Sequence, residues 1–290
     1  MNGELNIDLQ SFVKRTYAAL VYKSTMYKVL NENYIGDLRQ AGSPIIEVIK
    51  SNAVSVNVRS TAEIQSALAP SLTTYGSVKV DLTELPMDYS IRIPVAVMGS
   101  NITNALQDAI DQKDSAVAKR IDTYGYGVLK GNVSNAKQWN PTNAGDTIKL
   151  LNECRATLFN NDVYDNYRIA LGATEYSKYI TDLTSVLKYE TLQGVEGVDR
   201  GTIARAYGVD AFEVNDDYIN PTVDGHAETV VGYFFNPMAV VGDAFFDAFA
   251  QHYSPQGWPG YYVLEGNILF GCKVVRGEAI IKLQSGAVSS

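Results

Sequence analysis

Cysteine and histidine are scarce in this sequence, which has two of each among 290 residues. Two cysteines cannot form the multi-disulfide framework of a small secreted domain, and the chain has no CxxC pair that would indicate zinc. Cys154 and Cys272 each lie in an apolar stretch, so we predict that both are free, buried thiols. His226 and His252 belong to no HExxH pattern, so a transition-metal site would have to be assembled from distant residues.

A run of basic residues is also missing. The net charge is −8, the isoelectric point is about 4.9, and the densest basic spots are pairs such as Lys14-Arg15 and Lys119-Arg120. Proteins that grip nucleic acid present a basic surface, so the sequence argues against tight binding of DNA or RNA. No apolar stretch of about 18 residues occurs that could span a membrane. The N-terminus lacks the basic-then-apolar pattern of a signal peptide, and we expect a chain made in the cytoplasm.

The common catalytic motifs are absent too. There is no Gly-x-Ser-x-Gly turn for a serine nucleophile and no glycine-rich phosphate loop ending in Gly-Lys. Gly125–Gly131 contains three glycines, but it follows a helical pattern, so we interpret these glycines as helix terminators. The acidic turns Asn215-Asp216-Asp217 and Asn160-Asn161-Asp162 lack the spacing of a calcium loop and are interpreted as solvated turns. We predict no catalytic, cofactor-binding or metal-binding residues; the alternative is an enzyme with a dispersed site.

Two segments in the first half of the chain have the periodicity of amphipathic helices. Apolar residues recur three or four apart over 9–31 and, more clearly, over 102–128. The second helix would be roughly 40 Å long at about 1.5 Å per residue. A helix of this length in a chain of this size is typical of a backbone on which sheets pack.

Between these helices the sequence alternates as a strand does. Val54, Val56 and Val58 alternate with polar residues, and alternation returns over 78–93 after the small, polar stretch 60–76. The pattern predicts an extended β-hairpin with a long tip. An isolated two-stranded hairpin is marginally stable in water, so we expect a partner subunit to cover it.

The second half mixes short helices and strands. We expect Asp146 to cap a helix that continues to Leu158, and a second helix over 174–188. The expected strands are 167–171, two short ones within 203–214, 261–264, 273–276 and 279–283, with a polar loop at 215–228 and a mixed apolar segment at 229–249. Because strands and helices neither alternate strictly nor separate by halves, the fold class is α+β.

Several local motifs occur in a suggestive order. Asn33–Leu38 followed by Ala41-Gly42 forms a turn ahead of the hairpin, Gly208–Asn215 reads GVDAFEVN, and Gly271–Leu283 holds the last strands. These motifs, and above all the order of the parts, resemble the major capsid proteins of tailed bacteriophages with the HK97-type fold. The resemblance spans nearly the whole chain.

Membership of that family would imply a particular division of the chain. The implied segments are an N-terminal arm (1–40), an extended hairpin called the E-loop with adjoining P-domain strands (41–97), a P-domain spine helix (98–140), a central A-domain (141–235) and a return into the P-domain (236–290). The implied function is that of a non-enzymatic coat protein, which assembles as hexamers and pentamers into an icosahedral head around double-stranded DNA.

The resemblance also implies partners and a location. The partners would be other copies of the chain, a separate scaffolding protein, a portal, decoration proteins as further candidates, and packaged DNA contacted weakly and without sequence specificity. The product would reside in the virion after assembly in the host cytoplasm, with no cofactor and no membrane. Negative charge suits such a container, because a wall that gripped phosphates would impede packing and release.

Two further properties occur in some proteins of this fold, namely a covalent cross-link between subunits and an enclosed enzyme cargo. Some members cross-link subunits by a Lys–Asn isopeptide bond assisted by Glu, and Lys50 and Lys79 lie in the hairpin region. No partner Asn or Glu can be matched in this sequence, so the cross-link is not carried over. An encapsulin-like compartment, which shares the fold but encloses enzymes, is the alternative to a phage head.

Overall fold

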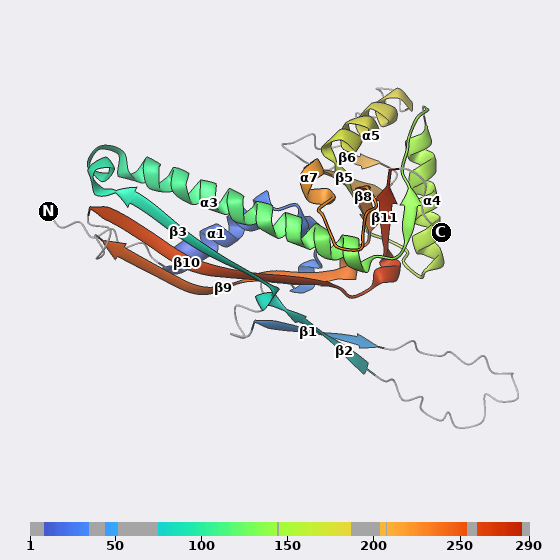
Figure 1. Cartoon of the computed structure of the whole chain (residues 1–290). Helices are drawn as coiled ribbons and strands as arrows, with labels where there is room; N and C mark the ends of the chain where they lie inside the picture. Colours follow the sequence, from blue (N-terminus) through green and yellow to red (C-terminus); the bar gives the residue numbers. More distant parts are fainter. Residues whose placement is uncertain are drawn as a thin grey trace, which may run out of the picture.

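The computed structural model of the 290-residue chain describes residues 9–34, 44–51, 75–143, 145–186, 204–206, 208–253 and 260–285. Figure 1 shows an elongated molecule with a compact part at one end and a long, flat part at the other. A two-stranded ribbon projects from the region where the two parts meet. Within the described residues, no helix is both long and apolar enough to cross a bilayer.

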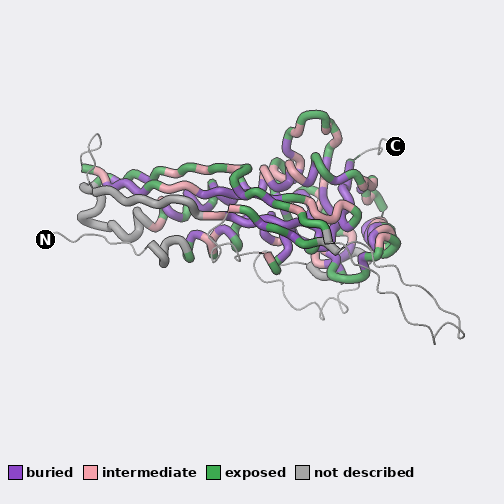
Figure 2. The backbone as a smooth tube through the Cα atoms, turned by 90° about the horizontal axis from the view of Figure 1, so that it is seen from below, coloured by how far each residue is buried: buried purple, intermediate pink, exposed green. Residues whose placement is uncertain are grey.

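The long part consists of helix α3 (Val95–Asn132) lying along a three-stranded antiparallel sheet. The sheet has the order β3 (Leu85–Pro94), β10 (Tyr261–Val274) and β9 (Val240–Tyr253). At 38 residues, α3 is about 57 Å long, longer at both ends than the predicted 102–128. Its apolar stripe packs on the sheet, and Figure 2 shows buried backbone concentrated where they meet and inside the compact part.

The prediction that glycines end this helix at Gly125–Gly131 is wrong, because all three glycines lie inside α3. At Gly125 a Cβ would lie 2.6 Å from the Cγ and Sδ atoms of Met26. The missing side chain therefore lets Met26, which is fully buried, pack directly on the helix. Glycine here serves close approach, and the backbone hydrogen bonds on either side keep the helix continuous.

Helix α1 (Leu9–Lys23) is shorter than the predicted 9–31. It ends because the buried carboxylate of Asp122 on α3 takes over the next donors. Asp122 accepts hydrogen bonds from the Ser24 and Thr25 hydroxyls at 2.6 and 3.0 Å, and from the backbone N–H groups of Thr25 and Met26 at 3.1 and 2.9 Å. The chain then turns through a short 3-10 helix, Met26–Lys28. A second 3-10 turn, Glu32–Tyr34, follows.

The compact part is built on a six-stranded mixed sheet. Its strands, in spatial order, are β4 (Ala136–Gln138), β11 (Ile280–Gln284), β8 (Val230–Phe235), β5 (Tyr167–Gly172), β7 (Val209–Val214) and β6 (Ala204–Ala206). The helices around it are α4 (Asp146–Asn160), α5 (Ala173–Val186) and the short α7 (Asp216–Ile219). β8 and β5 lie inside this sheet and each buries all but one of its residues, which explains their largely apolar sequences.

Several predictions for the second half are confirmed, and two are wrong. The helices, the strand at 167–171 and the two short strands within 203–214 are present, although α7 interrupts the predicted loop at 215–228. Asp146 is the first helical residue and not the cap; Gly145 with φ of 89° occupies the cap position. The strands expected at 261–264 and 273–276 are one strand, β10, whose long buried stretches hide the alternation.

The predicted hairpin is confirmed over its second arm up to Asp81, whereas the continuation predicted over 85–93 belongs to another sheet. β1 (Ile45–Ser51) pairs antiparallel with β2 (Tyr75–Asp81), from Ile45 opposite Asp81 to Ser51 opposite Tyr75. Of the predicted tip at 60–76, residues 60–74 lie outside the described residues, as does the alternating Val54–Val58, and Tyr75 and Gly76 belong to β2. The chain then passes through the 3-10 turn Leu82–Glu84 into β3, which leaves the ribbon and joins the long sheet.

The chain crosses between the two parts more than once. α3 runs from the long part into the compact part, β8 leads out to β9, and β10 leads back to β11. The predicted division into arm, hairpin, spine, A-domain and return therefore stays a prediction, with 236–290 contributing strands to both sheets.

Candidate assembly surfaces

The first candidate surface is the ribbon of β1 and β2. On its inner face Ile46, Val48 and Val80 are buried and pack with Val241 of β9. On its outer face, which carries Ile45, Glu47, Ile49, Ser77 and Lys79, the side chains of Ile45 and Ile49 are 45% and 69% exposed. The ribbon thus has apolar residues on both faces, and the residues that the structure describes cover only one of them.

The base of the ribbon is fixed to the long sheet by local geometry. Asp81 accepts hydrogen bonds from the backbone N–H and the hydroxyl of Thr83 at 2.8 and 2.7 Å, and these bonds lower the pKa of the Asp81 carboxyl. A Cβ at Gly271 of β10 would overlap the backbone carbonyl of Asp81. Gly271 therefore lets the ribbon cross β10 in contact with its backbone, so the direction of the ribbon is set by the fold.

The second candidate surface is a groove of about 850 Å³ between β3 and α3, which we call the β3 groove. Seven consecutive residues of β3, 85–91, line one side of it. The other side is a stripe of α3 that consists of Ala109, Gln112, Lys113, Ala116, Val117 and Arg120. Lys113 is 8% exposed; its Nζ atom lies 2.9 Å from Asp114 Oδ1 and 4.7 Å from the centre of the Tyr89 ring.

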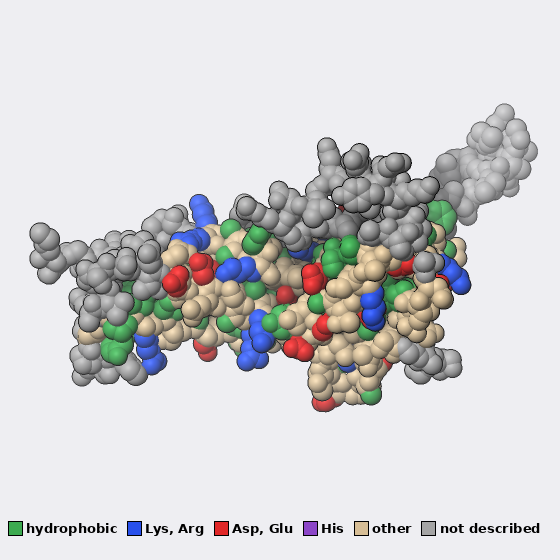
Figure 3. Space-filling model, turned by 90° about the horizontal axis from the view of Figure 1, so that it is seen from above, with side chains coloured by type: hydrophobic (Ala, Val, Ile, Leu, Met, Phe, Trp, Pro, Cys, Tyr) green, Lys and Arg blue, Asp and Glu red, His purple; other side chains and the backbone are tan. Residues whose placement is uncertain are grey.

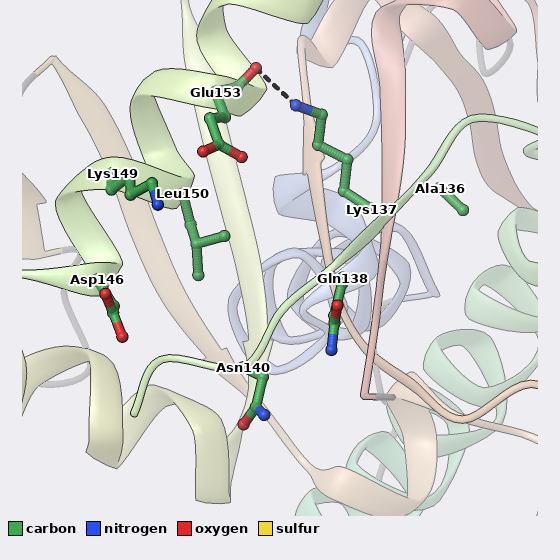
Figure 4. Close-up of a pocket in the computed structure, with 8 residues that line it drawn as sticks. All are labelled: Ala136, Lys137, Gln138, Asn140, Asp146, Lys149, Leu150 and Glu153. Atoms are coloured by element: carbon green, nitrogen blue, oxygen red, sulfur yellow. Dashed lines mark hydrogen bonds between the residues drawn. The ribbon is translucent and has the colours of Figure 1, made fainter. Parts of the chain in front are cut away.

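A third hollow, of about 530 Å³, lies between β4 and α4 in the compact part (Figure 4). Its charged lining residues are Lys137, Asp146, Lys149 and Glu153. The Lys137 Nζ atom donates to the backbone carbonyl of Glu153 at 3.0 Å, which ties the strand to the helix. The lining contains no histidine, cysteine or serine, so the hollow offers no hydroxyl or thiol nucleophile and no imidazole base.

The two histidines lie in different parts of the fold. His226 forms a β-bridge with Val223 in the compact part, and His252 lies on β9 opposite Val263 in the long sheet. The His226 Nδ1 atom is 3.3 Å from Glu228 Oε1, and Glu228 Oε1 accepts from Lys282 Nζ at 2.5 Å. The Lys282 bond lowers the pKa of the Glu228 carboxyl to about 2. The structure therefore gives no site that uses both histidines.

The Lys282 contact belongs to a buried network that joins α3 to the compact part. Lys282 Nζ also donates to the backbone carbonyl of Lys130 at 3.1 Å. Lys130 Nζ donates to Asn220 Oδ1 at 2.8 Å and to the carbonyl of Pro221 at 3.1 Å, and burial lowers the pKa of the Lys130 ammonium. Both lysines are 4% exposed, so these contacts hold the C-terminal end of α3 against the sheet.

The other candidate residues have structural roles. Cys154 and Cys272 are free and buried, as predicted, and burial raises the pKa of the Cys154 thiol to about 12. Asn215 caps α7 by accepting from the Asp217 N–H at 2.9 Å, and Asp216 accepts from the Thr174 hydroxyl at 2.7 Å. Across the part of the chain that the structure describes, no cluster of three His, Cys, Asp or Glu could hold a metal ion.

Sequence reasoning did not identify the outer face of the ribbon or the β3 groove. The run Ile45–Ile49 places apolar residues on both faces of β1, which is a signal that two surfaces need cover. The β3 groove depends on which strand lies at the edge of the sheet, and β3 pairs with β10, about 175 residues away in the sequence. No local pattern reports that pairing.

Comparison with known proteins gives the fold. No protein-family model matches the chain, and no curated protein matches it. A solved structure from Mycobacterium phage Che8 covers 90% of both chains with a TM-score of 0.60 and 14% identity. The capsid of cyanophage P-SCSP1u covers 85% of this chain and 84% of its own, with a TM-score of 0.58 and 12% identity.

The mature capsid of bacteriophage PhiM1 gives a third match, which covers 85% of this chain and 83% of its own with a TM-score of 0.57 and 10% identity. Identities this low show a shared fold. The likeness extends over most of each chain, so it includes both the long part and the compact part. The capsid fold expected from the sequence is thus confirmed.

Proposed function

We propose that the chain is the major capsid protein of a tailed bacteriophage, a structural subunit that assembles into the wall of the head. The observation that carries the proposal is the shared fold with phage capsid structures over 85% or more of this chain. A fold alone admits many functions. The uncovered outer face of the ribbon supplies an independent physical reason for assembly.

Burying the exposed isoleucines of the ribbon against another subunit is more favourable than leaving them in water. Ile49 is 69% exposed on a strand whose other face is already buried. Covering a large aliphatic side chain contributes about 1.5–3 kcal/mol relative to exposure. Such a contact between two different surfaces of identical subunits is heterologous, and it closes into rings when the rotation permits. Rings of six and five copies are the capsomers that we propose.

The remaining assignments follow from the same proposal. Residues 1–40 would be the arm, 41–97 the E-loop with adjoining strands, 98–140 the spine, 141–235 the A-domain and 236–290 the return into the P-domain. Scaffolding protein, portal and decoration proteins are the proposed partners, and the virion is the proposed location. Figure 3 shows basic and acidic side chains interspersed over one face, which suits weak, non-specific contact with packaged DNA.

The ribbon's outer face gives the sharpest test of the assembly role. Ile49→Asp should leave the folded chain intact and abolish large particles in light scattering, because a carboxylate cannot be buried in an apolar contact. Ser77→Asp is the matched control, since Ser77 lies directly opposite Ile49 and is exposed. It adds the same charge without removing the apolar side chain, and should weaken assembly much less.

The outcome also separates the alternatives. Particles that enclose DNA support a phage head, whereas particles that enclose protein cargo support the encapsulin-like compartment. A purified chain that stays monomeric with or without a scaffold, and an Ile49→Asp variant indistinguishable from it, would contradict the assembly role.

A further inference from the structure

A lysine amine lies against a side-chain amide where α3 meets the compact part. The Lys130 Nζ atom is 2.8 Å from Asn220 Oδ1, and the two residues are 90 positions apart in the sequence. A second hydrogen bond, to the carbonyl of Pro221 at 3.1 Å, holds the amine from another direction. Lysine is almost never fully buried without a partner, so the amine is kept beside this amide by the fold.

The segment that carries Asn220 packs directly on the helix. α7, which Asn220 follows, lies against α3 (Figure 1). A Cβ added at Gly127 would lie 3.7 Å from Pro221 Cγ, and one added at Gly131 would lie 3.8 Å from Val223 Cγ1. Residues 221–223 therefore pass over two positions of the helix that have no side chain. The contact between amine and amide is thus a consequence of packing and persists in the folded chain.

The Asn220 side chain is held in a form that favours attack on its carbonyl carbon. Its Oδ1 atom also accepts from the Val230 N–H at 3.1 Å, and a backbone N–H in this position stabilises negative charge that develops on the oxygen. The next residue is Pro221, which has no N–H, so the backbone attack that converts asparagine to a succinimide cannot occur here. The nucleophile that the fold places beside Asn220 is the Lys130 amine.

Burial favours the neutral, nucleophilic form of this amine. Loss of solvation lowers the pKa of the Lys130 ammonium; the charge of Glu228 opposes this effect and the charge of Lys282 reinforces it. Desolvation of this kind is one of the ways in which proteins activate lysine as a nucleophile. Lys282 in the same network differs, because it contacts the Glu228 carboxylate, and a carboxylate is not attacked by an ammonium group.

We propose that Lys130 and Asn220 become joined by an isopeptide bond within one chain. Lys130 Nζ attacks Asn220 Cγ, the Nζ–Cγ amide bond forms, the Cγ–Nδ2 bond breaks, and one ammonia leaves. The proton that Nζ loses passes to the leaving nitrogen through solvent, which reaches the partly exposed Asn220. The step needs no oxidant and no second chain. The inference therefore goes beyond the capsid role and does not depend on it.

The bond connects the long part to the compact part. Lys130 lies in the last turn of α3, and Asn220 follows α7 in the compact part. Both residues belong to one molecule and lie outside the ribbon, so the bond is not a link between subunits. It closes a covalent loop across 90 positions, which restricts the unfolded chain as a disulfide does. Pulling the end of α3 away from Asn220 would then require breaking a covalent bond.

The mass of the intact, purified full-length chain tests the bond directly. A bonded chain is lighter than its sequence by one ammonia. Lys130→Arg keeps the positive charge, but a guanidinium is always protonated and does not attack, so this variant should have the full mass of its sequence. Asn220→Ala removes the amide and should do the same. Lys119→Arg is the matched control, because Lys119 is an exposed lysine on the same helix, and this variant should remain lighter by one ammonia.

Peptide mapping of the denatured wild-type chain locates the bond without any variant. Trypsin does not cleave after an acylated lysine, so residues 121–137 should stay together and be joined through Lys130 to a peptide that contains Asn220. A wild-type chain with the full mass of its sequence overturns the inference. A loss of ammonia that persists in Lys130→Arg also overturns it, because the loss then arises at another asparagine.

The inference and the proposed function fail in different ways. Normal particles built from a wild-type chain of full mass would overturn the bond and leave the capsid role standing. A chain that yields the branched peptide but forms no particles under any condition would overturn the capsid role and leave the bond standing.

Discussion

The compact part and the ribbon differ in how far they bury their apolar residues. In the compact part, β5 and β8 bury nearly every side chain within the same molecule, and Phe234 and Phe235 are fully buried. In the ribbon, Ile45 and Ile49 remain exposed although they belong to a strand. The described residues of the compact part therefore cover their own apolar side chains, whereas the described residues leave the outer face of the ribbon uncovered.

This difference indicates that the compact part determines the stability of one molecule and that the outer face of the ribbon determines association between molecules. Changes in the compact part should act on the folding of a single molecule, because the buried contacts are internal. Changes on the ribbon's outer face should act on association and leave folding nearly untouched. Variants that affect one property without the other sharpen this comparison, and variants that affect both equally would break it.

The largest expected effect on folding is at the centre of the compact part. Phe234 is fully buried, and its ring stacks on Tyr167 with 5.7 Å between ring centroids. Phe234→Ala should lower the free energy of unfolding by about 3–5 kcal/mol, measured by urea denaturation. Phe159→Ala is the control, because Phe159 is 56% exposed, and should cost less than about 1 kcal/mol. Equal losses in the two variants would contradict the account.

A somewhat smaller effect is expected where α1 meets α3. Asp122→Ala leaves two backbone N–H groups and two hydroxyls without their acceptor, so the free energy of unfolding should fall by about 2–4 kcal/mol. Urea denaturation measures the loss. Asp108→Ala changes an exposed carboxylate on the same helix and should be near neutral. A neutral Asp122→Ala would show that the carboxylate does not fix the end of α1.

The smallest effect is expected at Glu228 and depends on pH. The hydrogen bond from Lys282 holds the Glu228 pKa at about 2, below its ordinary value of 4.5. The ionised carboxylate therefore stabilises the folded chain above pH 4.5, and this contribution is lost as the pH falls toward 2. Glu228→Gln should cost on the order of 1 kcal/mol at pH 7 and less at pH 3, by denaturation at both values.

The control for that experiment is Glu213→Gln, which changes an exposed carboxylate on β7. Its effect on the free energy of unfolding should be small at both values of pH. A Glu228→Gln loss that is the same at pH 3 and pH 7 would indicate that the Lys282 contact contributes nothing through charge.

Much of the fold could be predicted from the sequence because its signals are local. Period-two alternation from Val78 located β2 of the ribbon, and helical periodicity located the central stretch of α3. What failed depends on partners distant in the sequence. α1 ends at Lys23 because of Asp122, and α3 continues past Gly125 because Met26 packs there. Neither contact can be predicted from the residues that are adjacent in the sequence.

The candidate surfaces were even less accessible to sequence reasoning. The need for a cover over the hairpin was predicted from its marginal stability, but the exposed residues could not be named without the register of β1 and β2. The β3 groove required the order of the long sheet, which pairs residues 85–94 with 261–270. The separation of the two histidines likewise became clear only when each was placed in its own part of the fold.

The central claim is that copies of this chain complete one another in a shell. Negative-stain electron microscopy of the purified full-length protein, with and without a scaffolding protein, tests it most directly. The account predicts rings of five or six subunits and closed particles tens of nanometres across. A monodisperse monomer or dimer under every condition would contradict it.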